Sequence, residues 1–201
     1  FVAHARAGNA GINIATVVNF PSGNESRADV VKQATRAIED GATEIDLVLP
    51  YTAFKSGDVE AAGDMVSAIS DICFDTVLKV ILETGELVEA GLIAQASRLA
   101  IKKGADFIKT STGKVAVNAT KDAAQVMLTV IADGHRDVGL KPAGGIRSTA
   151  DAAAYLAMAD DIVGKGWATP DTFRFGASGV LDDLLAVLDG NSGSENAKGG
   201  Y

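Results

Sequence analysis

Short apolar runs alternate with longer amphipathic stretches along this chain of 201 residues. The apolar runs are rich in Val, Ile, Leu and Phe and are bounded by Gly, Pro or Asp, which is typical of buried strands. These predicted strands cover residues 12–20, 44–50, 76–84, 106–112, 137–143 and 173–178. The stretches between them carry apolar residues at helical spacing and predict helices over 25–40, 57–73, 88–103, 120–133, 148–159 and 179–189. Thr120 and Ser148 are the expected N-caps of the helices over 120–133 and 148–159.

Strands separated by helices indicate a parallel sheet, because a parallel crossover needs a dozen or more residues. Two architectures fit: an open doubly wound sheet or a (β/α)8 barrel. Six strands favour the open sheet by count alone. However, no glycine-rich dinucleotide fingerprint follows the first strand. Polar residues also follow most strands, as they do at the mouth of a barrel. At this point the strand count and the site chemistry disagree.

Composition and charge exclude several classes of function. Hydrophobic residues make up 47% of the chain and the formal net charge is −8, with no basic block. A nucleic-acid partner is therefore not expected, since binding of the phosphate backbone needs clustered Lys and Arg. The single cysteine, Cys73, cannot form an intrachain disulfide, and no apolar run reaches the ~18 residues of a membrane helix. A cytoplasmic protein with no membrane partner is expected.

Familiar metal and nucleophile motifs are missing. The two histidines, His4 and His135, have no H-x-x-H spacing, and there is no C-x-x-C. No metal and no cofactor are therefore predicted. TSTGKV lacks the earlier glycine and the final Ser or Thr of a P-loop, and GASG is not a G-x-S-x-G elbow.

Three lysines stand inside runs that otherwise suit buried strands: Lys79, Lys109 and Lys141. One such lysine is readily explained as an edge or snorkelling residue paired with Asp46 or Glu83. Three in successive units weaken that explanation. A lysine that is desolvated, or that lies beside a second cation, becomes a neutral amine that can attack an aldehyde or ketone.

Asp46 is a candidate third member of this group. It shares a strand face with Val48, and a carboxylate near two lysines could relay protons. A satisfied ion pair in the core explains Asp46 alone equally well.

Two glycine-rich segments follow the last two predicted strands. KPAGGIRST places Gly144 and Gly145 before a helix N-cap, and RFGASG places Gly176, Ser178 and Gly179 likewise. Backbone N–H groups at such positions can bind phosphate, and barrels often bind phosphate after their last two strands.

Six segments together resemble one family. VNFPSGN, EIDLVLPY, LKVILETGEL, GADFIKTSTGKVAVNAT, LKPAGGIR and RFGAS are similar to the deoxyribose-phosphate aldolases, over about residues 12–189. The resemblance implies a (β/α)8 barrel and a class I, Schiff-base aldolase. Its expected reaction is reversible cleavage of 2-deoxy-D-ribose 5-phosphate to D-glyceraldehyde 3-phosphate and acetaldehyde.

The resemblance also implies roles for individual residues. Lys109 would form the imine with acetaldehyde, Lys141 would lower its pKa and shuttle protons, and Asp46 would take part in the proton relay. Tyr201 would reach into the site and help to move a proton. Thr112 would lie near the substrate hydroxyls and Lys79 would line the pocket. The phosphate would meet Gly113, Lys114, Gly144, Gly145, Arg147, Gly176 and Ser178.

The chain departs from the family in two ways. Gly179 stands where the family often has a serine, so one phosphate contact is in doubt. Family members also have two βα units before the strand at 12–20, whereas here FVAHARAG resembles only the end of the second helix. The expectation is thus an N-terminally incomplete barrel domain with six of eight units over 1–189, followed by a flexible tail over 190–201.

The missing units leave alternatives open. The sequence is a partial record, or rearrangement or another subunit fills the gap; a homo-oligomer, dimer or tetramer, is expected. The partners expected are a small phosphorylated sugar and acetaldehyde. A Schiff-base aldolase for another aldehyde pair and a catalytically impaired, phosphosugar-binding remnant stay open as other functions.

Overall fold

Five parallel strands form the sheet of the computed structural model, which describes residues 2–8 and 11–190. The strands pair in chain order: β1 (Ala15–Val18), β2 (Glu44–Val48), β3 (Val77–Ile81), β4 (Phe107–Lys109) and β5 (Gly139–Lys141). Each lies within a predicted run and is shorter than that run. The parallel βα organisation predicted from the sequence is confirmed.

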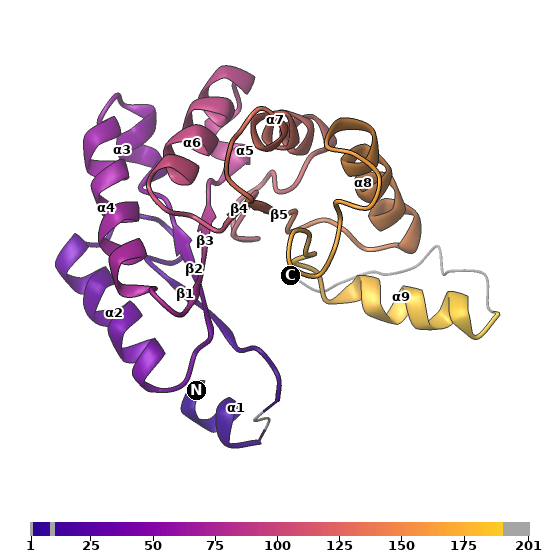
Figure 1. Ribbon diagram of the computed structural model, residues 1–201, viewed down its shortest axis with the longest axis horizontal. Helices are drawn as coiled ribbons and strands as arrows, with labels where there is room; N and C mark the ends of the chain where they lie inside the picture. Colours follow the sequence, from indigo (N-terminus) through magenta and orange to yellow (C-terminus); the bar gives the residue numbers. More distant parts are fainter. Residues whose placement is uncertain (1, 9–10, 191–201) are drawn as a thin grey trace.

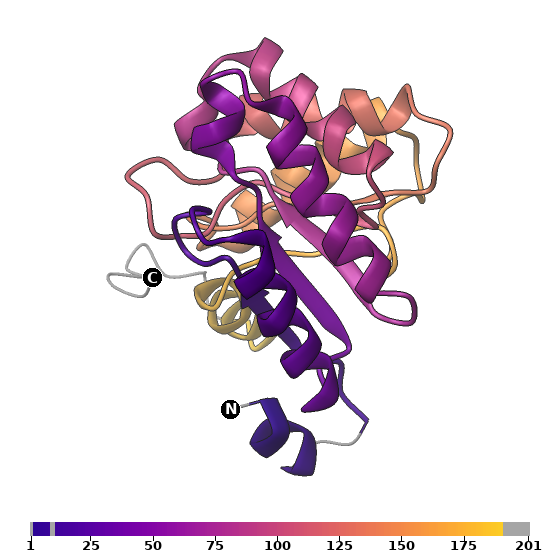
Figure 2. The same cartoon turned by 90° about the vertical axis from the view of Figure 1, so that its left-hand side faces the viewer.

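All six predicted helices are present, each within three residues of its predicted bounds. They are α2 (Arg27–Glu39), α4 (Val59–Ile72), α6 (Ala90–Lys102), α7 (Lys121–Ala132), α8 (Thr149–Ile162) and α9 (Gly179–Leu188). Helices α2, α4, α6, α7 and α8 follow one another around the outer side of the curved sheet (Figure 1), each in contact with the next. Figure 2 shows α2 and α4 side by side in front of the strands.

Three short helices complete the described structure: α1 (Val2–Gly8), α3 (Tyr51–Lys55) and α5 (Thr84–Leu87). The first ends at Gly8, and Arg6 joins it to the body through a hydrogen bond to the carbonyl of Gly41.

Local capping explains where the main helices begin. The side chain of Thr120 accepts a hydrogen bond from the N–H of Ala123, which makes Thr120 the predicted N-cap of α7. Ser148 and Asp151 form a reciprocal capping box at the start of α8. The side chain of Ser26 caps α2 by accepting the N–H of Asp29.

The segment predicted as a sixth strand, 173–178, is not a regular strand, and this part of the prediction is wrong. It runs parallel to β5 through two isolated bridges, Leu140 with Phe173 and Ala143 with Gly176. Between them lies Pro142, whose carbonyl accepts the N–H of Gly176 but which has no N–H to donate. The ladder is therefore broken at Pro142, although the chain follows the path that a sixth strand would take.

The two faces of the sheet are packed differently. Residues such as Ile45, Leu47, Val80 and Ile108 point outward and form the core with the helices. The inner face carries the charged residues described below. Among the described residues, no pairing joins β1 to the segment beside β5, so the ring of strands is open.

The open side of the arc leaves apolar side chains in contact with solvent. They are Ile12, Val17, Leu181, Leu184, Leu185 and Leu188, from the region of β1 and from α9. This is the exposure expected of a barrel that has six of eight units.

Candidate active site

Four neighbouring strands place charged side chains on the inner face of the sheet. Asp46 of β2 is the register partner of Lys79 of β3, and Lys109 of β4 is the partner of Lys141 of β5. Residues two apart on a strand share a face, so Glu44 lies below Asp46 on the same side. The strand register therefore brings together residues that are far apart in sequence.

Asp46 is the centre of this group. Its Oδ2 accepts hydrogen bonds from the Nζ of Lys109 and the Nζ of Lys141, both at 2.8 Å, and its Oδ1 accepts one from Lys79 at 3.1 Å. The two amines on Oδ2 can be no further apart than the sum of their distances to that atom. Lys109 and Lys141 therefore lie together on one oxygen of Asp46.

A second layer of charges supports the first. Lys79 donates a second hydrogen bond to Glu44, whose other oxygen accepts one from Arg174 at 3.2 Å. The guanidinium of Arg174 lies over the ring of Phe107, 5.6 Å from its centroid. Gly139 leaves the space for that ring, because a Cβ at this position would lie 2.2 Å from it.

The electrostatics of the cluster are set by four cations around two carboxylates. Burial opposes the ionisation of Asp46, but the charges of Lys109, Lys141 and Lys79 outweigh it and hold the pKa of this carboxyl well below its usual value. The pKa of Lys141 is lowered, first by burial, with Asp46 acting in the opposite direction and the charges of Lys109 and Lys79 adding to the lowering. The cluster therefore favours loss of a proton from a lysine rather than protonation of Asp46.

The loop after β4 is fixed by a buried carboxylate. Glu83 has left-handed backbone angles (φ 57°) and no exposed surface. Its carboxylate accepts the N–H of Thr112 at 3.2 and 3.3 Å and the hydroxyl of Thr112 at 2.5 Å. The Thr112 hydroxyl in turn accepts the N–H of Lys114 at 3.0 Å. Burial, the largest influence, raises the pKa of Glu83, and the bonds from Thr112 oppose it.

The two predicted glycine loops lie against each other beside Lys141. Gly176 has no room for a side chain, because a Cβ would lie 2.5 Å from that of Ala143 and 3.6 Å from Cε of Lys141. The N–H of Gly144 bonds to the carbonyl of Gly176, and the N–H of Gly176 bonds to Pro142. The N–H groups of Gly144 and Gly176, which were predicted to meet a phosphate, therefore already bond to backbone carbonyls.

Other predicted phosphate residues lie around these loops. Within the described ranges, the N–H groups of Gly113 and Gly145 have no hydrogen-bond partner, and both residues have positive φ. Arg147, Lys114 and Ser178 are exposed. Ser178 precedes α9 without capping it through its side chain. Tyr201 lies outside the described residues, as does the segment 191–200.

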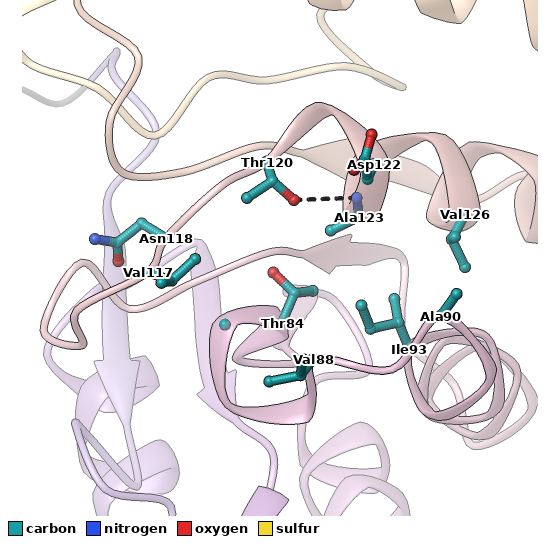
Figure 3. A pocket seen from close by; sticks show the side chains of 11 residues that line it. Thr84, Val88, Ala90, Ile93, Val117, Asn118, Thr120, Asp122, Ala123 and Val126 are labelled. Carbon is teal, nitrogen blue, oxygen red and sulfur yellow. Dashed lines mark hydrogen bonds between the residues drawn. The ribbon is translucent and has the colours of Figure 1, made fainter.

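A separate pocket of about 270 Å³ lies between the starts of α6 and α7 (Figure 3). Val88, Ile93 and Val126 line it together with Thr84 and Asn118, and it includes none of the predicted site residues. The Thr84 hydroxyl and the Asn118 side-chain oxygen are buried there without a hydrogen-bond partner among the described residues. This pocket is distinct from the lysine cluster.

Three residues of the site were not identified as site residues from the sequence: Glu44, Arg174 and Glu83. Glu44 could have been found, since it is two positions before Asp46 and shares its strand face. Arg174 could also have been found, because it lies between Phe173 and Phe175 and a strand would turn it to the opposite face from those two rings. Glu83 had been considered only as an ion-pair partner for a strand lysine.

The remaining residues with reactive side chains lie elsewhere. His4 and His135 are exposed. Cys73 is buried, and burial raises the pKa of its thiol to about 11. Within residues 2–8 and 11–190, no three His, Cys, Asp or Glu side chains gather as metal ligands would. None of the described helices is long and apolar enough to cross a membrane.

Comparison with known proteins agrees with this geometry. The family model described as DeoC/LacD family aldolase matches residues 1–181. The chain is 56% identical, over 99% of its length and 78% of the relative, to a deoxyribose-phosphate aldolase of Agrobacterium fabrum (strain C58).

Solved structures give the same result. An aldolase named QR15 superposes with a TM-score of 0.79 at 28% identity, over 94% of this chain and 80% of that one. The tetrameric deoxyribose phosphate aldolase of Aeropyrum pernix, at 24% identity, superposes with a TM-score of 0.75 over 93% and 72% and supports the fold alone. Sequence, fold and the lysine cluster agree, and the chain belongs to the DeoC/LacD family of aldolases.

Proposed function

We propose that this chain catalyses the reversible cleavage of 2-deoxy-D-ribose 5-phosphate to D-glyceraldehyde 3-phosphate and acetaldehyde through a lysine imine. The observation that carries the proposal is the pair of ammonium groups, from Lys109 and Lys141, on one oxygen of Asp46. The similarity to the Agrobacterium deoxyribose-phosphate aldolase supports the choice of substrate.

Lys109 is the proposed nucleophile. Its neutral amine adds to the substrate aldehyde carbon, and loss of water from the adduct gives a protonated imine. This iminium draws electrons from the bond between the second and third carbons. The hydroxyl on the third carbon gives up its proton, the bond breaks and D-glyceraldehyde 3-phosphate leaves. The remaining enamine takes a proton on carbon, and water releases acetaldehyde and the free amine.

Lys141 and Asp46 are the proposed proton carriers for these steps. The Lys109 amine and the Lys141 amine each donate a hydrogen bond to Oδ2 of Asp46. A proton can therefore pass between the two lysines through Asp46. We assign Lys79 a supporting role, because its side chain is 0% exposed and its ammonium bonds to Asp46 and Glu44. Tyr201 is proposed as a further proton carrier.

The phosphate end is proposed to lie on the loops around Gly113, Lys114, Gly144, Gly145, Arg147, Gly176 and Ser178. The N–H groups of Gly113 and Gly145 are free to meet phosphate oxygens, whereas those of Gly144 and Gly176 bond to the backbone. Lys114 and Arg147 add local positive charge for an anion in a chain whose net charge is −8.

Reductive trapping tests the proposal. Acetaldehyde and sodium borohydride should add an ethyl group to Lys109, found by mass spectrometry of peptides. Lys109→Met should abolish the label, and the exposed Lys102 should stay unlabelled in both proteins. Labelling elsewhere with Lys109 unmodified would contradict the assignment.

A second candidate function is phosphosugar binding without turnover. The open ring of strands and the exposed leucines of α9 favour it, because an unsupported barrel holds its site less rigidly. Calorimetric binding of 2-deoxyribose 5-phosphate with no release of acetaldehyde would support this function over the first. An aldolase acting on another aldehyde pair would be separated from both by a panel of acceptor aldehydes.

We further propose that the chain works as a homo-oligomer, dimer or tetramer, in the cytoplasm. The exposed apolar side chains of α9 support an assembly. Sedimentation at several concentrations measures it.

A further inference from the structure

Glu83 is a fully buried carboxylate that the proposed mechanism does not use. It lies two residues after β3, and among the described residues no cation lies within ion-pair distance of it. Its hydrogen-bond donors are the N–H and the hydroxyl of Thr112. A buried charge and a left-handed backbone are both unfavourable, so this contact with Thr112 needs an explanation.

The contact fixes the direction of every hydrogen bond at the Thr112 hydroxyl. A hydroxyl has one proton and two lone pairs. The proton is donated to Oε2 of Glu83, and one lone pair accepts the N–H of Lys114. The only remaining capacity is one lone pair, which can accept but not donate.

We propose that Glu83 determines specificity by making Thr112 a hydrogen-bond acceptor for a substrate hydroxyl. This inference rests on the proposed function. Along the chain, Thr112 lies between Lys109, the proposed nucleophile, and Gly113, at the proposed phosphate end. A carbonyl or phosphate oxygen brought to this lone pair would be repelled, whereas a hydroxyl would be bound.

The chemistry identifies which hydroxyl is bound. In open-chain 2-deoxyribose 5-phosphate, the hydroxyl on the third carbon becomes the aldehyde oxygen on cleavage and loses its proton. The hydroxyl on the fourth carbon keeps its proton throughout and becomes the one beside the aldehyde in D-glyceraldehyde 3-phosphate. An acceptor that cannot donate suits the hydroxyl on the fourth carbon, because this hydroxyl keeps its proton to donate.

The test compares two acceptor aldehydes in the direction of bond formation with acetaldehyde. D-Glyceraldehyde 3-phosphate carries the hydroxyl, and 3-oxopropyl phosphate has the same phosphate but lacks it. The ratio of their kcat/KM values should be about fivefold in the unaltered protein, as expected for one neutral hydrogen bond. The ratio cancels any general loss of folded or active protein.

Substitutions at the two residues should lower or abolish this preference. Thr112→Val removes the acceptor and should bring the ratio close to one. Glu83→Gln should lower the ratio, because the amide places its NH2 group either against the hydroxyl or against the N–H of Thr112 and so disturbs the contact that orients the hydroxyl. The double variant Thr112→Val with Glu83→Gln should lower the ratio no further than Thr112→Val alone. Glu39→Gln on the exposed end of α2 and Thr129→Val on the exposed side of α7 make matched changes and should keep the ratio.

Trapping of Lys109 with acetaldehyde and borohydride separates the possible failures. If Lys109 is not labelled in the unaltered protein, the proposed function fails. If Lys109 is labelled and Glu83→Gln keeps the fivefold ratio, only the inference about Glu83 is overturned. Should Glu83→Gln not fold, Glu83→Asp, which withdraws the carboxylate by one methylene, should also lower the ratio, and an unchanged ratio there overturns the inference.

Discussion

Replacing Asp46 with asparagine removes the negative charge around which three ammonium groups gather, while the shape of the side chain is kept. Lys109 and Lys141 then face each other across a neutral amide, with Lys79 below them. We expect the folded state to lose stability and to release a proton from one lysine. Lys141 is the expected source, since its pKa is already lowered.

Two routes give the size of the effect. Removing one partner of a buried ion pair typically costs about 3–5 kcal/mol. Keeping a lysine neutral at pH 7, when its pKa in the unfolded chain is about 10.4, costs about 5 kcal/mol at about 1.36 kcal/mol per pKa unit. For a chain of this size, such a loss lowers Tm by about 6–20 °C, at about 2–4 °C for each kcal/mol.

The pH dependence distinguishes this explanation from a general loss of packing. The pKa of Asp46 is lowered in the folded state, so its stabilising contribution is present above the unfolded pKa of about 4 and is lost as pH falls toward the folded value. In Asp46→Asn we expect the pKa of one buried lysine to fall below its unfolded value. The free-energy cost of keeping this lysine neutral in the folded state is present at pH 7 and disappears as pH rises toward about 10. The stability gap between the two proteins should therefore be widest between about pH 5 and pH 8.

Urea unfolding followed by circular dichroism, at pH values from 4 to 10, measures this gap. Asp71→Asn, on the exposed side of α4, is the matched control and should change stability by less than about 0.5 kcal/mol. A gap below about 1 kcal/mol at pH 7, or one that stays constant between pH 7 and pH 10, would refute the electrostatic reasoning.

Three further outcomes are expected. Lys141→Met should lower kcat/KM at pH 7 by about 100-fold, because a proposed proton carrier beside Lys109 is gone; steady-state rates check this, and an unchanged rate would count against it. Gly139→Ala should destabilise the fold by about 1–3 kcal/mol in urea unfolding, since its methyl group would overlap the ring of Phe107. Cys73, whose thiol pKa is raised to about 11 by burial, should react with iodoacetamide at pH 8 only as fast as the protein unfolds.

Much of the fold was predictable because it follows from local patterns. Thr120 and Ser148 were identified as N-caps from residue type and position, and both make the expected bonds. The short helices α3 and α5 were missed, because helices of one turn carry no periodicity that a sequence shows. The sixth strand was predicted from its apolar pattern, and what prevents it is the missing N–H of Pro142, which belongs to the neighbouring segment.

The residues of the site were predictable from the sequence, but most of their contacts were not. Its lysines stood out because a lysine is unusual inside a buried strand, and the face of Asp46 followed from the twofold repeat of a strand. The sharing of one Asp46 oxygen by two lysines depends on the register of β2, β4 and β5, which no local pattern encodes. Glu83 was passed over as a site residue because its role depends on a contact with Thr112 across two loops.

The arrangement of charge also argues against the simplest alternative, a purely structural ion pair. Such a network would balance its charges, yet here four cations surround two carboxylates. The imbalance lies at Asp46: Lys109 and Lys141, 10% and 14% exposed, share one of its oxygens. Lys79 is 0% exposed, and Arg174, 29% exposed, bonds to Glu44. Cations in excess therefore lie at the end that a small carbonyl compound can reach, and there repulsion between them helps to free an amine for attack.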